Sequence, residues 1–458
     1  MKIKIEVVDP IECKVRKSHA IFLIPCLSYK AAFWRQGQHK KVRTEYKKHL
    51  FSHKTKDYWY FYTGFLNKVK GFCKRKGIEV EVTEKYIHEF FSLGKPNVPG
   101  FTLRDDQKEI IDKALKTQRG IIKEPTGWGK TIIQMGIMSA IKGNCLLLAH
   151  TSSIVNQTVE KIRDVGWDCL QIGGGAGYDA IFRSDKIVVA TIQTLAKVPV
   201  DDYNTMFNAV LVDEAHRVSK FTGQYAKILS NIFAPIRLGF TATLPTEKEA
   251  KLAMKGFFGN VISQHTINDG IEKGILATPK IKLIKSRFRQ SIRDQKKYAD
   301  VYQKGIVNNL SRNRQVRDVV LKHSKKGETT LIFVNKIEHG KNLVILFQDE
   351  GITVPFVRGN MPEDKRKIIK TSLINKKRKI VIATTAWKEG VDIPSLDVVF
   401  NAGGGKSEIV VYQPIGRGLR RTSEKDTVII YDFFDPSSPF LIEHFGHRIS
   451  LYFDNNWL

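Results

Sequence analysis

The chain is poor in the features that mark secreted, disulfide-rich or membrane proteins. Its five cysteines are odd in number and never form a CxxC pair. This pattern argues against a disulfide framework or a cysteine-rich zinc site and predicts a reducing, cytoplasmic setting. The sequence has no run of about 18 apolar residues, and residues 1–5 lack the apolar core of a signal peptide. We therefore expect a protein that neither crosses a membrane nor is secreted.

Acidic residues are scarce relative to basic ones. Lys and Arg number 75 against 46 for Asp and Glu, which gives a formal net charge of +29 in 458 residues. Cations that neutralise phosphates release condensed counterions, so an excess of this size predicts a polyanionic partner, which we interpret as nucleic acid. The chain is too long for one hydrophobic core, so two or three domains are expected.

Residues 1–95 differ in pattern from the rest. They combine an alternating start, a dense basic stretch over 40–56, an aromatic run over 58–62 and a helical pattern over 65–76. These features predict a small α+β domain with one basic face, an accessory domain that we expect to bind DNA. The aromatic run could stack on bases at a junction, but the core of the domain is the simpler interpretation.

From residue 101 onward, short apolar runs alternate with helical patterns. Continuous Val, Ile and Leu runs between helices predict parallel sheets that are covered on both faces. We divide this part into two lobes, 101–280 and 281–458, and the polar, basic helical stretch 287–324 is expected to bridge them. No internal repeat is visible by pattern, although two lobes of one fold type can diverge beyond recognition.

A glycine-rich turn in the first lobe has the composition of a phosphate-binding loop. Glu124-Pro-Thr-Gly-Trp-Gly-Lys-Thr131 follows an apolar run and opens a helical pattern over 132–141. Such a turn supplies backbone N–H groups and the positive end of a helix dipole to phosphates. Lys130 would reach the β- and γ-phosphates of ATP, and the Thr131 hydroxyl would bind Mg²⁺. One departure is Glu124, which stands where such loops usually begin with glycine.

Asp213-Glu-Ala-His216 supplies the acidic partner that this loop needs. An apolar strand over 209–212 delivers Asp213 and Glu214 at its carboxyl end, where ligands bind in doubly wound folds. Asp213 would hold Mg²⁺ through water, and Glu214 would polarise the attacking water.

These motifs, together with those that follow them, resemble the superfamily-two helicases over residues 101–431. Residues 103–107 are similar to the adenine-reading element, 241–243 to the element that couples hydrolysis to movement, 383–394 to the fifth element and 413–420 to the sixth. The resemblance implies an α/β fold of two tandem RecA-like, parallel-sheet lobes of the P-loop NTPase type, plus the small α+β N-terminal domain.

The resemblance also implies roles for individual residues. Catalytic roles would fall on Lys130, Asp213, Glu214, His216, Gln413, Arg417 and Arg420. ATP would be bound by Arg104, Gln107, Pro125, Thr126, Gly127, Trp128, Gly129, Lys130, Thr131, Gly390 and Asp392, and Mg²⁺ by Thr131 and Asp213. The nucleic acid would contact Thr151, Thr191, Arg358, Gly359, Thr384 and Thr385. Arg417 and Arg420 lie three residues apart on one helical face, from which they would approach the γ-phosphate.

Two further glycine runs imitate a phosphate-binding loop. Gly403-Gly-Gly-Lys406 follows a strand, but the residue six positions before Lys406 is Phe400 instead of glycine. The run at 173–177 lacks both a lysine and a GxGxxG spacing. We interpret both as loops, the first as one that can touch nucleic acid and the second as a surface loop.

Details of the motifs favour a DNA enzyme. Thr241-Ala-Thr243-Leu-Pro and Tyr412-Gln-Pro-Ile-Gly-Arg417 lean towards DNA helicases, and the size and layout of the chain resemble the phage branch-migration and fork-reversal helicases of the UvsW-like group. That resemblance implies a monomer in the host-cell cytoplasm that moves 3′ to 5′ on forks, four-way junctions and R-loops, in replication, recombination or repair. Two alternatives stay open: an RNA or RNA–DNA hybrid helicase, and an ATP-gated binding scaffold.

Overall fold

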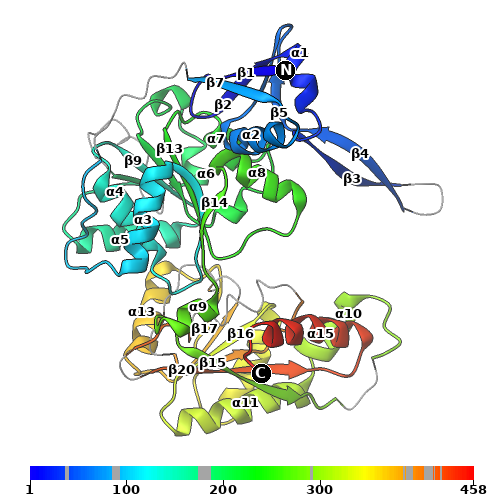
Figure 1. Ribbon diagram of the computed structural model, residues 1–458. Coiled ribbons are helices and arrows are strands. Elements are labelled where there is room, and N and C mark those ends of the chain that lie inside the picture. The colour runs from blue at the N-terminus through cyan, green and yellow to red at the C-terminus, as the bar shows by residue number, and fades with distance from the viewer. Residues whose placement is uncertain are drawn as a thin grey trace. The chain divides into compact units, whose positions relative to one another are not determined.

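The computed structural model of the chain divides into two compact units (Figure 1). The first comprises Met1–Glu124 and Lys130–Gln264, and the second comprises Pro125–Gly129 and His265–Leu458. The structure describes all residues except 37–40, 85–92, 174–186, 289–291, 385–386, 388–392, 394–395, 407–415, 417 and 423–424. The side chains of 33–36 and 41–44 are likewise outside the description.

The N-terminal part of the first unit is an α+β domain on a five-stranded sheet with the order β5-β6-β2-β1-β7. β1 pairs with β7 in parallel, and the other pairs are antiparallel. On β1 the buried Ile3, Ile5 and Val7 alternate with more exposed residues, as the alternating sequence predicts. The elements are β1 (Lys2–Val7), β2 (Glu12–Arg16), α1 (Lys17–Leu23), β5 (Phe51–Lys54), β6 (Tyr58–Tyr62), η1 (Thr63–Phe65), α2 (Leu66–Arg75) and β7 (Glu79–Glu84).

A separate two-stranded hairpin of β3 (Ser28–Gln36) and β4 (Lys41–His49) extends from this domain (Figure 1). Its antiparallel register runs from Ser28↔His49 to Gln36↔Lys41. The base of the hairpin is fixed by Tyr29, which is buried, and by Lys48, whose Nζ lies 2.7 Å from Glu249 Oε1. These contacts anchor the base of the hairpin on the domain and on α8 (Lys248–Phe258).

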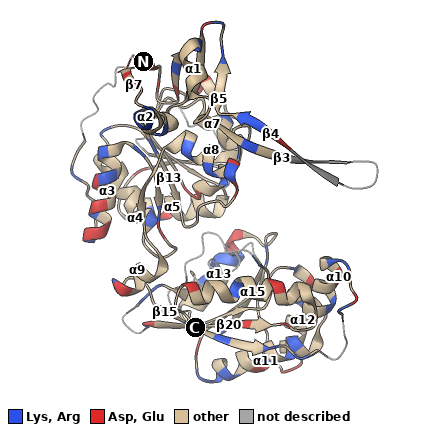
Figure 2. Cartoon of the chain, turned by 45° about the vertical axis from the view of Figure 1, so that its right-hand side comes forward, with Lys and Arg blue, Asp and Glu red and all other residues tan. Residues whose placement is uncertain are grey.

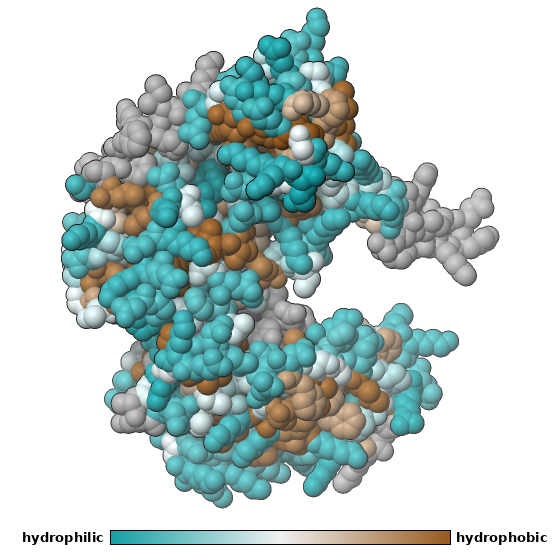
Figure 3. Space-filling model, viewed as in Figure 1, coloured by the Kyte–Doolittle hydropathy of each residue, from teal (hydrophilic) through white to brown (hydrophobic). Residues whose placement is uncertain are grey.

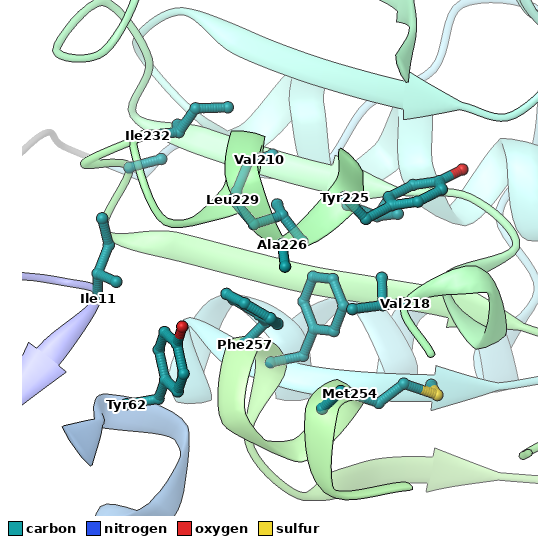
Figure 4. Packing of buried hydrophobic residues seen from close by; sticks show 14 of the residues in the cluster. Ile11, Tyr62, Val210, Val218, Tyr225, Ala226, Leu229, Ile232, Met254 and Phe257 are labelled. Atoms are coloured by element: carbon teal, nitrogen blue, oxygen red, sulfur yellow. The ribbon is translucent and has the colours of Figure 1, made fainter. Parts of the chain in front are cut away.

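The N-terminal domain packs against the first lobe through aromatic side chains (Figure 4). Tyr62 stacks on Phe221 with ring centroids 5.4 Å apart and contacts Phe257 at 4.8 Å. A β-carbon placed on Gly64 would lie 2.1 Å from the carbonyl oxygen of Lys255, so the two backbones touch there. Phe61 is fully buried and Tyr62 nearly so. The aromatic run 58–62 thus contributes to a core that spans the domain and the lobe.

The first lobe has a seven-stranded, all-parallel sheet with the order β10-β11-β9-β12-β13-β8-β14. Its central strands are buried along their whole length, as continuous apolar runs require between two helical layers. The strands are β8 (Arg119–Lys123), β9 (Cys145–Ala149), β10 (Leu170–Ile172), β11 (Ile187–Thr191), β12 (Ala209–Val212), β13 (Ile236–Thr241) and β14 (Val261–Gln264). The helices are α3 (Asp105–Thr117), α4 (Lys130–Ala140), α5 (Ser152–Asp164), α6 (Ile192–Leu195), η2 (Val200–Asp202), η3 (Ala215–Arg217), α7 (Gln224–Leu229) and α8 (Lys248–Phe258).

The second lobe has a six-stranded, all-parallel sheet with the order β15-β20-β19-β16-β18-β17. Its strands are β15 (Thr278–Lys285), β16 (Thr330–Val334), β17 (Phe356–Val357), β18 (Ile380–Thr384), β19 (Val398–Asn401) and β20 (Thr427–Phe434). Its helices are α9 (Ile267–Glu272), α10 (Tyr298–Tyr302), η4 (Gln303–Val307), α11 (Leu310–Lys325), α12 (Ile337–Gln348), α13 (Glu363–Ile374) and α15 (Pro439–Asp454). β15 already pairs within this sheet, so the basic stretch 287–324 lies inside the lobe and does not bridge the two lobes.

The two parallel sheets repeat one topology. Numbered along the chain from the first strand of each lobe, both sheets have the spatial order 3-4-2-5-6-1, and the first lobe adds β14 at its edge. Two RecA-like lobes therefore follow each other, although the sequence shows no repeat. In such sheets, ligands bind at the carboxyl ends of the strands.

The surface and the cysteines agree with the composition. Hydrophilic residues cover most of the face that Figure 3 shows. All five cysteines are buried, and burial raises the pKa of the Cys13 and Cys145 thiols to about 12, so both stay protonated. No helix in the described ranges has the length and apolar character needed to span a bilayer.

Candidate active site

The turn between β8 and α4 has the backbone geometry of a phosphate-binding loop. β8 ends at Lys123, α4 begins at Lys130, and the φ angles of Gly127 and Gly129 are 91° and 96°. Side chains rarely tolerate such left-handed values, so both positions need glycine. Lys130 Nζ donates to the carbonyl oxygen of Glu124 at 2.9 Å across the turn. The predicted residues 125–131 thus lie together at the carboxyl end of an interior strand.

Glu124, the unusual residue of this turn, points away from it. Its side chain is fully buried, and its Oε1 accepts a hydrogen bond of 2.6 Å from Ser263 Oγ on β14. Its backbone N–H donates to Thr241 O at 3.0 Å, and its φ is not positive. Glycine is therefore not required at this position, and the loop geometry is preserved.

Asp213 follows β12 and carries a buried oxygen that lacks a donor. The Oδ1 atom is inaccessible to solvent and has no hydrogen-bond partner in the part of the chain that the structure describes, although the residue as a whole is partly exposed. Burial raises the pKa of Asp213 to about 6; the Glu214 carboxylate adds to the rise, and Lys130 opposes it. A hydrated cation would satisfy such an oxygen, so Asp213 fits a Mg²⁺ site.

The protein would supply few Mg²⁺ ligands of its own. Among the described residues, no group of three or more His, Cys, Asp or Glu side chains could hold a metal ion. Mg²⁺ commonly keeps several waters and binds one or two protein groups together with substrate phosphates. Asp213 and Thr131, the predicted pair, are consistent with that mode.

Glu214, His216 and Thr241 form a hydrogen-bonded group that joins β12 to β13. His216 Nδ1 lies 3.2 Å from Glu214 Oε2 and 3.0 Å from Thr241 Oγ1. The Thr241 hydroxyl donates to the Thr243 carbonyl oxygen at 2.7 Å. Because that hydroxyl has a single proton, its oxygen must accept from His216. His216 Nδ1 is therefore protonated, and its proton is shared between Glu214 and Thr241.

Glu214 also has an unusual backbone. Its φ is 50° and its ψ is 46°, in the left-handed region that non-glycine residues rarely occupy. Such conformations cost about 1–3 kcal/mol and cluster at functional sites. The strain places the Glu214 carboxylate beside His216, where it is linked to the 241–243 segment of the next strand.

The predicted adenine-reading residues form the start of α3. The backbone N–H of Arg104 donates to Gln107 Oε1 at 3.2 Å, and the Arg104 guanidinium binds Asp106 through Nε at 2.9 Å. Gln107 is only 4% exposed. The Gln107 side chain is thus oriented by the cap of α3.

Two predicted nucleic-acid contacts are helix N-caps at neighbouring strand ends. The Thr151 hydroxyl, which follows β9, accepts from Ile154 N at 3.4 Å. The Thr191 hydroxyl, at the end of β11, accepts from Thr194 N at 3.3 Å and is nearly buried. β9 and β11 are adjacent and parallel, so both caps lie on one edge of the sheet.

In the second lobe, Thr384, Arg358 and Gly359 follow strand ends at the carboxyl edge of the sheet, whereas Arg420 lies beside the start of β15. Thr384 ends β18 and is 7% exposed. Arg358 and the exposed Gly359 follow β17, the neighbouring strand. Arg420 forms an antiparallel β-bridge with Leu276. Gln413, Arg417, Gly390, Asp392 and Thr385 lie outside the described residues.

Buried charged side chains hydrogen-bond to the backbone at and next to the glycine run 403–406. Arg312 is fully buried, bonds Asp435 at 3.0 Å and donates to the Ala402 carbonyl oxygen at 2.8 Å. Arg448 bonds Asp432 at 2.7 Å and donates to the Gly405 carbonyl oxygen at 2.6 Å. The run follows β19, the fifth strand of its sheet, whereas the phosphate-binding turn of the first lobe follows the first strand. Its place in the strand order thus differs from that of the turn at 124–131, and buried side chains brace it.

Several residues of this site escape sequence reasoning. Ser263, Arg312 and Arg448 hydrogen-bond to carboxylates more than a dozen positions away in the sequence. The residues next to them in the sequence do not indicate these partners. Trp128 is different, because a large aromatic residue inside a glycine turn is itself a signal. Its side chain is fully buried, so its backbone, not its ring, is available to phosphates.

Comparisons with known proteins give relatives for both lobes. Residues 100–246 match the family described as type III restriction enzyme, res subunit, and residues 311–422 match the helicase conserved C-terminal domain. The chain is 26% identical over 404 residues to the ATP-dependent DNA helicase uvsW of Enterobacteria phage T4, covering 81% of this chain and 78% of that protein. It is 25% identical over 392 residues to the DNA 3'-5' translocase XPB2 of Sulfurisphaera tokodaii, covering 77% and 85%.

Among solved structures, the ATP-dependent Type ISP restriction-modification enzyme LlaBIII bound to DNA has a similar fold. Its TM-score is 0.60 at 16% identity, with 82% of this chain and 32% of that chain covered. At that identity the likeness concerns the fold alone, and this chain spans about a third of that enzyme.

Proposed function

This chain belongs to the superfamily-two helicases and is an ATP-driven enzyme, and on that premise we propose that it translocates on DNA and remodels branched DNA. Forks and four-way junctions are the proposed substrates, in replication, recombination or repair. The similarity to a phage DNA helicase and to a DNA translocase supports DNA as the track.

For ATP hydrolysis we assign the roles as follows. Lys130 and the backbone N–H groups of residues 126–131, which follow Pro125, would hold the phosphates. Thr131 and Asp213 would hold Mg²⁺, which neutralises phosphate charge when bound. Glu214, oriented by His216, would accept the proton of the attacking water. Arg417, Arg420 and Gln413 would complete the site from the second lobe. Arg104 and Gln107 would bind adenine, and Gly390 and Asp392 would contact the nucleotide.

For the nucleic acid we assign the strand ends described above. Thr151 and Thr191 in the first lobe, and Arg358, Gly359, Thr384 and Thr385 in the second, would contact the sugar–phosphate backbone. Such contacts position a strand without reading its bases, which suits stepping along DNA of any sequence. The second lobe begins at His265 in the structure and not at the predicted residue 281, because β15 already pairs with β20. Residues 1–95 are the proposed DNA-binding accessory domain.

The observation that carries branched-DNA binding is the β3–β4 hairpin. Lys30 and Lys47 are both exposed and lie directly opposite each other in the register. Like charges in such a pair destabilise a sheet, and among the described residues β3 and β4 pair only with each other, as a two-stranded sheet. A polyanion would relieve it, and a two-stranded ribbon fits the major groove of duplex DNA. Figure 2 shows the basic residues on both strands.

A substrate panel tests the proposed function. ATPase and strand-displacement rates would be measured on a fork, a four-way junction, linear duplex, single-stranded DNA, single-stranded RNA and an RNA–DNA hybrid. We expect the branched DNA substrates to give the highest rates of both reactions. Preference for RNA or for the hybrid would move the assignment to an RNA remodeller, and ATPase without displacement of any strand would indicate a clamp.

The hairpin is tested separately by charge removal. Lys30→Gln with Lys47→Gln should weaken fork binding and lower the slope of log affinity against log salt by about 2, since each phosphate contact contributes roughly 0.9. The matched control is Lys113→Gln with Lys116→Gln, two exposed lysines of α3. An equal loss of slope in the control would attribute the effect to net charge alone.

A further inference from the structure

The side chain of Trp128 ties the tip of the phosphate-binding turn to the chain segment 265–277. The indole stacks on the His265 imidazole, with centroids 4.4 Å apart and an interplanar angle of 19°. A β-carbon on Gly270 of α9 would lie 3.2 Å from Trp128 Cζ3, so the absence of a side chain at Gly270 makes room for the indole. Lys273 Nζ lies 5.7 Å from the ring centroid. The turn thus rests on α9 and the residues next to it.

Leu276 fills the space between the same turn and α9. Its side chain is 2% exposed. A β-carbon on Gly127 would lie 2.9 Å from Leu276 Cδ2, and one on Gly270 would lie 2.6 Å from Leu276 Cδ1. The backbone of Leu276 is held by a hydrogen bond of 2.9 Å from its N–H to Gly270 O. A shift of the turn at Gly127 therefore cannot leave Leu276 unmoved.

The backbone of Leu276 is also paired with that of Arg420. The two residues form an antiparallel β-bridge, and the N–H of Ala277 donates to Leu419 O at 2.7 Å. Nearby, a β-carbon on Gly416 would lie 2.9 Å from Thr126 Cβ, so Gly416 touches the turn as well. Residues 125–129, Leu276 and Arg420 all belong to the second compact unit.

We infer that Leu276, with Trp128, is a positioning residue that couples the turn of the phosphate-binding loop to Arg420. Bound phosphates would fix the positions of Gly127 and Trp128. Leu276 packs against Gly127 and pairs with Arg420, so fixing the turn would also fix the backbone position of Arg420. Placement of the arginine is then conditional on an occupied turn. The inference rests on the proposed role of Arg420, and it gives the segment 265–277 a function that none of the helicase motifs supplies.

A double-mutant cycle on ATP hydrolysis tests this coupling in the full chain with fork DNA present. Leu276→Ala should lower kcat roughly 10- to 100-fold, the effect of misplacing a catalytic group by about 1 Å. The Kd of a fluorescent ADP, which lacks the γ-phosphate, should change less than about twofold in this variant. Arg420→Ala should lower kcat too, and the double variant should lose no more than Arg420→Ala alone, because Leu276 acts through the arginine.

Leu343→Ala is the matched control, since Leu343 is a fully buried leucine of α12 in another core of the same lobe. It should lower the melting temperature but leave kcat near the parent value. Leu276→Met should restore most of the activity, and Leu276→Val carries the test if Leu276→Ala does not fold. Additive losses of Leu276→Ala and Arg420→Ala, or an unchanged kcat, would overturn the coupling. Absence of ATPase activity in the parent chain would instead refute the proposed function.

Discussion

Replacing Asp213 by Asn should abolish ATP hydrolysis and yet stabilise the free protein at neutral pH. The pKa of Asp213 rises from an ordinary 3.8 to about 6, first because the carboxyl is buried and second because Glu214 lies beside it. One pKa unit corresponds to about 1.4 kcal/mol, so the ionised carboxylate costs up to about 3 kcal/mol of folding free energy. Asn has nearly the same shape and carries no charge, so it avoids this cost.

The pH dependence follows from the direction of the shift. A carboxylate with a raised folded pKa costs stability only while it is ionised. The cost is therefore complete above about pH 6, shrinks as the pH falls through the folded pKa, and vanishes below the unfolded value of 3.8. The advantage of Asp213→Asn in the free energy of unfolding should be largest at pH 8 and about half as large at pH 5.

Urea unfolding of the parent and the variant at pH 8, 6.5 and 5 measures this difference. Asp201→Asn is the control, because Asp201 is exposed and its replacement should change the unfolding free energy by less than about 0.5 kcal/mol. Mg²⁺ with ADP should narrow the gap at pH 8, since a cation at Asp213 stabilises the parent alone. The electrostatic reasoning would be refuted if the variant were no more stable than the parent at pH 8. It would also be refuted if the gain in unfolding free energy at pH 5 equalled the gain at pH 8.

Four further substitutions probe the site and its support. Lys130→Ala and Glu214→Gln should each abolish ATP hydrolysis with unchanged circular dichroism, and robust branch migration by either variant would contradict the motor. Thr241→Val removes the acceptor for His216 and should lower the rate of strand displacement more than the rate of ATP turnover. Equal losses of both rates would show that the Thr241 hydroxyl does not couple hydrolysis to strand displacement. Arg448→Met leaves Asp432 buried without its cation and should cost about 3–5 kcal/mol, most of which Arg448→Met with Asp432→Asn should restore; melting temperatures decide this.

Much of the fold is legible in local patterns. The continuous apolar run at 209–212 is β12 to the residue, and the helix expected at 132–141 is α4, Lys130–Ala140. The place of the basic stretch 287–324 in the fold was predicted wrongly, because its sequence is polar on every side and shows no face that packs on a sheet. There Asn309 caps a new helix by accepting from Arg312 N at 3.1 Å. Arg312 reads as a surface charge but is fully buried against Asp435, 123 residues later.

In the candidate site, too, the sequence predicts the local features but not the contacts between distant residues. A glycine turn, a lysine and an acidic strand exit are recognisable from sequence because each is a short contiguous segment whose chemistry depends on near neighbours. The proton shared by Glu214 and Thr241 through His216 needs the pairing of β12 with β13. The environment of Glu124 needs Ser263 on another strand. Pairs of this kind leave no trace in the spacing of residues.

Side-chain periodicity and turn chemistry predicted most segments and their order, and net charge predicted a polyanionic partner, because these properties are local or additive along the chain. Tertiary structure alone revealed that both lobes repeat one strand order and that Trp128 and Leu276 join the phosphate-binding turn to Arg420. Strand order and side-chain contact depend on which distant segments pack together. That choice is made by the free energy of the whole core, and no single stretch of sequence contains it.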